Sequence, residues 1–214
     1  MPAYRLATWN ISQSKGFAQF LQQQDVVVLQ EANPGSRKEI TAAGFKFVVS
    51  QRSHCGETHI YARRGLMAHP FGDQWPHGTT CALIDDRWLI CGVHWPPFKE
   101  GNIHRDKCAN WVMAKLRDHQ YVVIAGDTNM RTGETVSEWD DAFLIAGKPK
   151  EHNFTMNGYE NKGWWADRPF KWICRYDRIY IRHHEWKLEQ FMVDKGNFIS
   201  DHYCLKAQLQ MVEE

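Results

Sequence analysis

Nine short runs of aliphatic, β-branched and aromatic residues recur along the chain, and each is the length of a single β-strand. Several of these runs mix β-branched with aromatic residues and are bounded by Gly, Pro or Asp, which is the pattern of β-strands. We expect strands at Tyr4–Asn10, Val26–Gln30, Phe45–Ser50, Thr58–Arg63, Thr80–Ile84, Trp88–His94, Tyr121–Asp127, Ile173–Arg182 and His202–Gln210.

Four segments between these runs predict helices. Two of them begin with the Ser/Thr-x-x-Glu spacing of a capping box, and both of these end at a glycine. Many strands with a few helices between them predict two sheets packed face to face, with helices on the outside. The helices are marked by Ser14 as a cap before Phe17, Phe20 and Leu21; by Ser36, Glu39 and the stop Gly44; by Cys108, Trp111, Val112 and Leu116, ending near Gln120; and by Thr135, Glu138, Trp139, Phe143 and the stop Gly147.

Composition limits the class of protein. The 214 residues are 43% hydrophobic and 24% charged, and no linker or repeat divides them, so we expect one domain over residues 1–214. The N-terminal sequence MPAYRLATWN has no apolar signal region and no run is long enough to span a membrane, which predicts an intracellular protein, cytoplasmic or nuclear. The six cysteines occur singly and in no CxxC pair, so we expect reduced thiols rather than a zinc site.

Polar residues stand at or beside the end of six of the apolar runs. One such case is explained by a strand that simply reaches water. Six cases that use acids, amides and imidazoles predict instead that strand ends meet at one edge of the sandwich. The polar residues are Asn10 after ATW, Gln30 and Glu31 in VVVLQE, His94 in LICGVH, Asp127 and Asn129 in VVIAGDTN, Asp177 in RYDR, and Asp201 and His202 in ISDH.

These residue types suit the hydrolysis of a phosphodiester. Phosphate oxygens are negatively charged, so a hard cation held by carboxylates must offset their charge. A water molecule must be aligned and deprotonated opposite the leaving group. Neutral donors and an imidazolium should meet the charge that builds in the transition state. No activated Ser or Cys stands among these residues, which favours direct attack by water.

The ordered motifs TWN, LQE, GDTN and SDH extend across nearly the whole chain and resemble those of the exonuclease–endonuclease–phosphatase superfamily. Within it, the complete GDTN, the acidic helix after it, AGKPK before a Thr, and RYDRIYIR before SDH are most similar to the 5′-tyrosyl-DNA phosphodiesterases. The resemblance implies an α+β fold, a four-layer αββα sandwich of two mixed β-sheets flanked by helices, with a divalent-metal site.

The resemblance also implies a role for each matching position. Glu31 would bind the metal directly, and Asp201 would support it directly or through water. Magnesium is the expected ion because the ligands are carboxylate and amide oxygens, although manganese would satisfy the same set. The expected catalytic residues are Asp127 to orient and activate water, Asn129 and Asn10 to hold phosphate and water, His202 to stabilise charged oxygens, Asp177 to keep the His202 ring in place, and His94 to contact phosphate. Whether Asp127 or His202 is the general base stays open.

The sequence supports one of these roles independently. Asp177 shares a strand face with Ile179 and Ile181, and a carboxylate on an apolar face needs a partner because an unpaired buried charge is costly. A salt bridge to Arg175 or Arg178 would satisfy it, and so would a hydrogen bond to an oriented imidazole.

Two positions depart from the pattern of the tyrosyl-DNA enzymes. Their strand ending in the phosphate-binding His is usually followed by an aliphatic, an acidic and a hydroxyl residue, whereas here His94 is followed by Trp95-Pro96-Pro97. Thr155 precedes Met156-Asn157 where those enzymes often have Trp-Asp. Near the start of the third predicted helix, His104 and Arg105 are the candidates for a basic phosphate clamp.

Basic and aromatic residues alternate between Lys162 and Lys187, and this pattern is typical of a groove for single-stranded or frayed nucleic-acid ends. A solvated loop held to the sandwich by its tryptophans would give the same pattern. The candidate substrate-binding residues are Arg105, Arg175, Trp164, Trp165 and Trp172.

The sequence therefore predicts a Mg²⁺-dependent monomeric phosphodiesterase of the DNA-repair type. It would cut the 5′-phosphotyrosyl bond between a protein or peptide and a DNA (or RNA) end by direct attack of water, leaving a 5′-phosphate, and would need no membrane. The alternatives keep the site and change the substrate: an abasic-site endonuclease, a 3′-exonuclease or deadenylase, or a lipid phosphodiesterase. A catalytically silent nucleic-acid-binding module is a further alternative, but the motif residues are all present.

Overall fold

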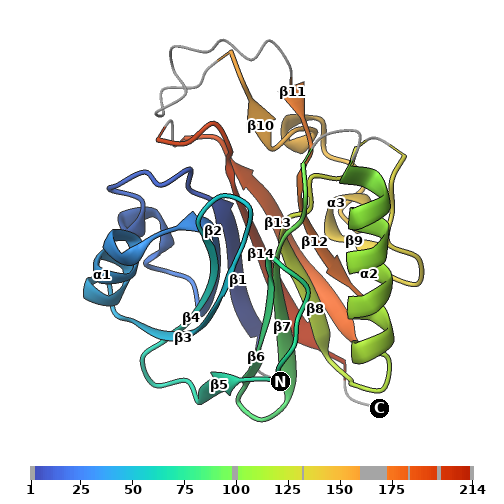
Figure 1. Cartoon of the computed structure of the whole chain (residues 1–214), viewed down its shortest axis with the longest axis horizontal. Coiled ribbons are helices and arrows are strands. Elements are labelled where there is room, and N and C mark those ends of the chain that lie inside the picture. The colour runs from blue at the N-terminus through green and yellow to red at the C-terminus, as the bar shows by residue number, and fades with distance from the viewer. Residues whose placement is uncertain are drawn as a thin grey trace.

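Two six-stranded mixed sheets face each other in the computed structural model, which describes residues 3–97, 101–131, 133–159, 173–182, 184–196 and 199–212 (Figure 1). The first sheet has the order β13 (Trp186–Asp194), β14 (Cys204–Met211), β1 (Ala3–Asn10), β2 (Val26–Ala32), β4 (Glu57–Arg63) and β3 (Phe45–Arg52). The second has the order β5 (Ala68–Pro70), β6 (Thr79–Ile84), β7 (Trp88–His94), β8 (Val122–Asp127), β12 (Asp177–Ile181) and β9 (Asp140–Asp141).

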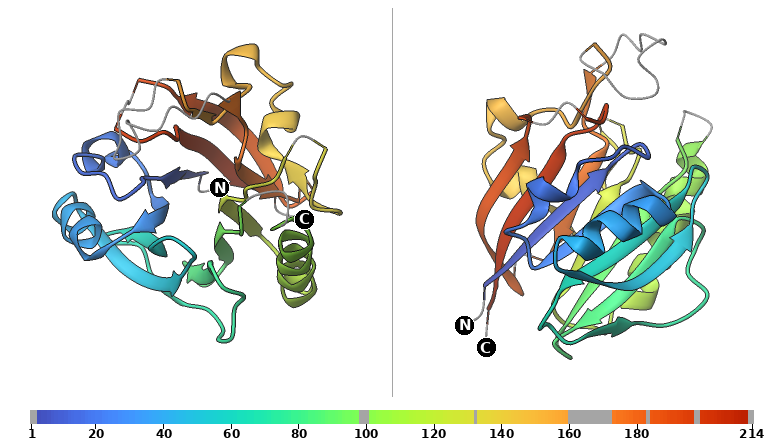
Figure 2. Two further views of the ribbon diagram at one scale, coloured as in Figure 1. Left: turned by 45° about the horizontal axis from the view of Figure 1, so that its top comes forward. Right: turned by 90° about the vertical axis from the view of Figure 1, so that its left-hand side faces the viewer.

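Helices cover the outer faces of both sheets, which makes four layers. Helix α1 (Pro34–Ala42) and the 3-10 turn η1 (Ala18–Leu21) pack on the first sheet, and α2 (Asn102–Leu116) packs on the second (Figure 2). The short helix α3 (Ala142–Ile145) and the turn η3 (Lys150–His152) lie beside β12 and β13. The predicted αββα sandwich is confirmed. No helix among the described residues is both long and apolar enough to cross a lipid bilayer.

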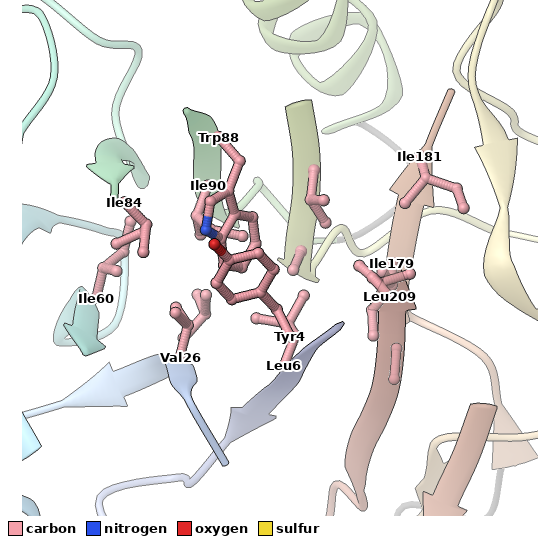
Figure 3. Packing of buried hydrophobic residues seen from close by; sticks show 14 of the residues in the cluster. Tyr4, Leu6, Val26, Ile60, Ile84, Trp88, Ile90, Ile179, Ile181 and Leu209 are labelled. Atoms are coloured by element: carbon pink, nitrogen blue, oxygen red, sulfur yellow. The ribbon is translucent and has the colours of Figure 1, made fainter. Parts of the chain in front are cut away.

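Strand alternation builds the core between the sheets. On β1, Tyr4 and Leu6 face the second sheet, while Ala7 and Trp9 face η1 and α1. Residues from both sheets interdigitate in this layer, including Trp88 against Tyr4 (Figure 3). All of the named side chains are buried.

At one end of the sandwich, the inward-facing positions of the strands are occupied by polar residues. Parallel pairing of β1 with β2 sets Asn10 opposite Gln30, and parallel pairing of β7 with β8 sets His94 opposite Asp127. Antiparallel β12 adds Asp177 opposite Asp127. The inward-facing series that is apolar through the core therefore ends in amides, acids and an imidazole at a single edge.

A small two-stranded sheet of β10 (Met156–Asn157) and β11 (Ile173–Cys174) projects from the end of the sandwich that is farther from the N-terminus (Figure 1). Met156 also forms an isolated bridge with His202, so this arm starts beside the polar edge. The predicted strand Ile173–Arg182 is in fact two strands, β11 and β12, which belong to different sheets.

Three predicted helix starts are wrong. Asn33, not Ser36, is the N-cap of α1, and Ser36 is the third helical residue that completes the capping box with it. The capping-box spacing of Thr135 and Glu138 starts no helix, because Asp141 caps α3 instead. Ser14 does not cap η1, since its hydroxyl donates to the carbonyl of Ile199.

Strand β13 was not predicted from the sequence. It is an edge strand with several exposed positions, and a bulge between Leu188 and Gln190 interrupts its alternation. The short strands β5, β9 and β10 were also missed. All six cysteines are free thiols, as predicted.

Candidate active site

Asn10 joins the two sheets at the polar edge. Its amide nitrogen donates to Glu31 Oε1 over 3.1 Å and to Asp127 Oδ2 over 3.0 Å. Glu31 belongs to the first sheet and Asp127 to the second, so the amide holds two carboxylates from opposite layers at one point. Asn10 and Asp127 are almost fully buried, and Glu31 is partly exposed.

Glu31 reaches this point through an irregularity in β2. Regular alternation after the inward-facing Gln30 would direct Glu31 outward, but the register with β4 shifts between Leu29 and Ala32. The backbone of Glu31 lies at φ +53°, in the left-handed region, and this turns its side chain toward Asn10. Burial raises the pKa of Glu31, and the hydrogen bond from Asn10 opposes that rise.

Asp127 follows Gly126, whose backbone lies close against Val93 of β7. A Cβ on Gly126, at φ +151°, would lie 2.0 Å from the carbonyl oxygen of Val93, so only glycine fits before this carboxylate. Asp127 Oδ1 accepts from the backbone N–H of Asn129 over 2.9 Å. Burial opposes ionisation, but the charge of His202 and the donated hydrogen bonds lower the pKa of Asp127, which favours a carboxylate.

The backbone of Asn129 lies in the left-handed region, with φ at +50°, a conformation that Asn adopts more readily than most residues. Its side-chain amide donates to the carbonyl of Trp95 over 2.9 Å, which ties the segment after β8 to the segment after β7. The side chain is partly exposed beside the buried Asp127. The Asn129 side chain is therefore fixed beside Asp127 by its hydrogen bond to Trp95.

His202 is the partner of Asp177, the carboxylate on the apolar face of β12. His202 Nδ1 lies 2.8 Å from Asp177 Oδ2, while the two alternative partners, Arg175 and Arg178, pair with Asp141 instead. Burial works against an imidazolium, but the carboxylates of Asp177 and Asp201 outweigh it and raise the pKa of His202 well above the usual value. Its Nε2 faces Asp127 Oδ2 at 3.9 Å.

His94 provides a second and different imidazole. Its Nδ1 lies 3.1 Å from the hydroxyl of Ser53, its Nε2 lies 3.7 Å from Asp127 Oδ2, and the exposed ring of His54 packs on it with centroids 4.1 Å apart. Burial lowers the pKa of His94 to about 3, although Asp127 opposes the shift. The site therefore combines one charged imidazole with one neutral imidazole.

Asp201 lies in a network of hydroxyl groups beside Asn10. Its Oδ1 accepts from the Ser12 hydroxyl over 2.6 Å, and the Ser200 hydroxyl donates to the Asn10 carbonyl over 2.7 Å. Sequence reasoning missed Ser12, Ser53 and Ser200. Ser12, two residues after Asn10, and Ser200, next to Asp201, could have been found from those neighbours, whereas no sequence signal marks Ser53.

A cation could be held here in two ways. Among the described residues, Asp127, Asp177 and His202 offer ligand atoms within 4.8 Å of one another. His202 could bind a metal only as a neutral imidazole, whereas its bond to Asp177 favours the charged form. The partly exposed carboxylate of Glu31, held by the amide of Asn10, suits a hard divalent cation better.

The candidate substrate-binding residues are placed differently from the catalytic ones. Arg105 is fully buried and pairs with Glu134, so it does not lie open to a substrate as expected. Arg175 pairs with Asp141 and packs over Phe143. Trp164, Trp165 and Trp172 lie outside the described residues.

Comparisons with known proteins identify the family of the chain. A sequence profile described as "Endonuclease/Exonuclease/phosphatase family" matches residues 7–202, so the chain belongs to that family. It is 27% identical over 148 residues to "Tyrosyl-DNA phosphodiesterase 2" of Mus musculus, a match that covers 61% of this chain and 40% of the mouse protein. The chain thus spans less than half of that relative's length.

Solved structures show the same fold. The crystal structure of D. rerio TDP2 in complex with a single-stranded DNA product has a TM-score of 0.77 at 18% identity, covering 98% of this chain and 100% of that one. TDP2 from C. elegans gives a TM-score of 0.73 at 18% identity, covering 97% and 75%. A Bacteroides thetaiotaomicron protein of the endonuclease/exonuclease/phosphatase family gives 0.69 at 14% identity, covering 100% and 99%.

Proposed function

We propose that this member of the endonuclease/exonuclease/phosphatase family is a metal-dependent phosphodiesterase that hydrolyses a 5′-phosphotyrosyl bond at a nucleic-acid end. The observation that carries the proposal is the buried set of Asp127, the Asp177–His202 pair and the bridging Asn10. It combines an ionised carboxylate, an oriented imidazolium and a neutral amide within one small volume. The name of the mouse relative and the sequence motifs support the tyrosyl substrate.

Each group has a task in this reaction. The Asp127 carboxylate would orient a water molecule and accept its proton as the oxygen attacks phosphorus. The His202 imidazolium, held by Asp177, would stabilise the negative charge that builds on the phosphoryl oxygens. Asn10 and Asn129 would fix water and phosphate, and neutral His94 would add a hydrogen bond to phosphate without another charge.

The products follow from the bonds that change. Water forms the new P–O bond and the P–O bond to the tyrosine oxygen breaks, which leaves a 5′-phosphate and a tyrosine side chain that takes up a proton. A divalent cation, which we propose to be Mg²⁺ with Mn²⁺ as a substitute, would be held by Glu31 with support from Asp201. When bound, such an ion offsets phosphate charge and stabilises the leaving oxygen.

A panel of oligonucleotides tests the proposal against its alternatives. One strand carries a 5′-phosphotyrosine, a second an abasic site in duplex, and a third a 3′ poly(A) tail, each incubated with Mg²⁺ and with EDTA. We expect tyrosine release from the first strand at the highest kcat/KM, and no release in EDTA. Faster cleavage of the second or third strand would refute the tyrosyl substrate while keeping the phosphodiesterase chemistry.

The Asp127→Asn variant separates an enzyme from a silent binding module. The amide is isosteric with the carboxylate but cannot accept the proton of water, so we expect turnover to fall by about 10²-fold or more while oligonucleotide binding is kept. Unchanged turnover would refute the role of Asp127. Binding without turnover in the native protein would favour the silent module.

A further inference from the structure

Two buried arginines converge on the segment that follows β8. This segment, residues 128–134 with residue 132 outside the described part, begins directly after Asp127 and contains Asn129. Arg105 lies in the first turn of α2 and Arg178 lies on the outer face of β12. Both guanidinium groups are shielded from solvent, so their charges need defined partners.

Arg105 links two active-site loops. Its Nε and Nη2 donate to the two carboxylate oxygens of Glu134 over 3.0 and 2.8 Å, and its Nη1 donates to the carbonyl of Pro96 over 3.0 Å. Pro96 stands two residues after His94, and Glu134 stands in the segment that contains Asn129. The planar guanidinium thus fixes the loop after β7 against the loop after β8.

Arg178 contacts the backbone of the same segment. Its Nη1 donates to the Glu134 carbonyl over 3.2 Å, and its Nη2 donates to the Arg131 carbonyl over 3.2 Å and the Met130 carbonyl over 3.4 Å. Strand alternation points Arg178 outward while its neighbour Asp177 points inward to His202. Strand β12 therefore positions the His202 imidazole through Asp177 and residues 130–134 through Arg178.

Asn129 lies in this same segment. It has φ +50° and donates to the Trp95 carbonyl over 2.9 Å, so its side chain connects the two loops that Arg105 also connects. We propose that Arg105 and Arg178 are positioning residues that brace residues 128–134 so that Asp127 and Asn129 keep the geometry needed for turnover. This inference rests on the proposed hydrolase function for its activity readout, and it adds residues that touch no substrate.

The chain offers a matched control in Arg63. Arg63 is the last residue of β4, at the end of the strand that is farther from the site. Its side chain also donates to backbone carbonyls, to that of Gln24 over 3.0 and 2.7 Å and to that of Leu21 over 3.4 Å. Its guanidinium stacks on Phe45, with 4.1 Å from Cζ to the ring centroid. Arg63→Met removes the same kind of contact without touching residues 128–134.

The test compares Arg105→Met and Arg178→Met with Arg63→Met in the full chain. Two readouts are used: steady-state cleavage of a 5′-tyrosyl oligonucleotide and of bis-p-nitrophenyl phosphate, and hydrogen exchange of the peptide that covers residues 127–134. We expect kcat to fall by about 10²-fold in the first two variants with KM within about threefold, as for a small misplacement of catalytic groups. Exchange should accelerate at least about tenfold in that peptide, a 1.4 kcal/mol change.

Arg63→Met should have the native kcat and the native exchange rate in the peptide of residues 127–134. We expect this even if its melting temperature falls as much as those of Arg105→Met and Arg178→Met. If Arg105→Met does not fold, Glu134→Gln replaces it, because the partly exposed amide still accepts one bond. Native kcat in the brace variants, or an equal loss in Arg63→Met, would overturn the proposal. If the native protein cleaves neither substrate, the proposed function is refuted. The exchange measurement still tests the two arginines in that case, because unchanged exchange in Arg105→Met and Arg178→Met would refute their positioning role.

Discussion

The buried His94 should make the stability of the protein depend on pH in a way that can be calculated. Burial lowers its pKa to about 3 in the folded chain, whereas an unfolded histidine titrates near 6.5. Between these values the unfolded state binds a proton that the folded state does not. The contribution of neutral His94 to the free energy of unfolding is therefore present above about pH 6.5, and it is lost progressively as the pH falls toward 3.

The magnitude follows from the two pKa values. At pH 7.5 the contribution is nearly complete, and at pH 5.5 about 1.4 kcal/mol of unfolding free energy has been lost through this residue, rising to about 2.7 kcal/mol at pH 4.5. The value at pH 5.5 is insensitive to the folded pKa as long as that pKa lies below about 4.5. The loss is large enough to measure in urea.

The assay is urea unfolding at pH 7.5, 6.5, 5.5 and 4.5 in EDTA, for the native protein and for His94→Asn. The variant should lose less stability between pH 7.5 and 5.5, by about 1.4 kcal/mol. His69→Gln removes a largely exposed histidine and should follow the native protein. Equal pH dependence in His94→Asn and the native protein would refute the account of His94 as a neutral buried ring.

Three further predictions test other parts of the site. Gly126→Ala should lower the unfolding free energy by about 3 kcal/mol or more in urea, because the new Cβ meets the Val93 carbonyl, while Gly133→Ala, with no atom within 4 Å, should lose about 1 kcal/mol. Asp177→Asn should reduce kcat by about 10²-fold or more and shift the basic limb of the kcat profile to lower pH, because the His202 imidazolium loses its carboxylate; an unshifted limb would count against that pairing. Burial, with a contribution from Glu31, raises the pKa of Cys55 to about 11, so iodoacetamide should modify Cys55 about 10²-fold more slowly than an ordinary thiol at pH 8; mass spectrometry showing rapid labelling would contradict this.

Much of the site could be predicted because alternation and strand pairing are local rules. Asn10, His94 and Asp127 end regular strands, so their inward direction follows from apolar residues an even number of positions earlier, which are Leu6, Ile90 and Ala125. Asp177 could be paired with His202 because an acid on an apolar face needs a partner, and the structure shows that bond. The catalytic roles themselves stay predictions.

Other features depend on contacts that the sequence does not show. The left-handed turn at Glu31 is set by a register shift between β2 and β4, and no local pattern marks it. Arg105 has the sequence context of a surface helix start, but its partner Glu134 lies 29 residues away. Asn33 caps α1 in place of Ser36, because both residues suit an N-cap and only the backbone at Asn33, at φ −141° and ψ 176°, is extended.

Single-turnover hydrolysis of a 5′-tyrosyl oligonucleotide in H₂¹⁸O shows which bond to phosphorus forms and which one breaks. If Asp127 directs water onto phosphorus, mass spectrometry will find one ¹⁸O in the released 5′-phosphate and none in tyrosine, and Asp127→Asn will form almost no labelled product in the same time. Label in the tyrosine oxygen, a 5′-phosphate without ¹⁸O, or native labelling rates in Asp127→Asn would contradict the account.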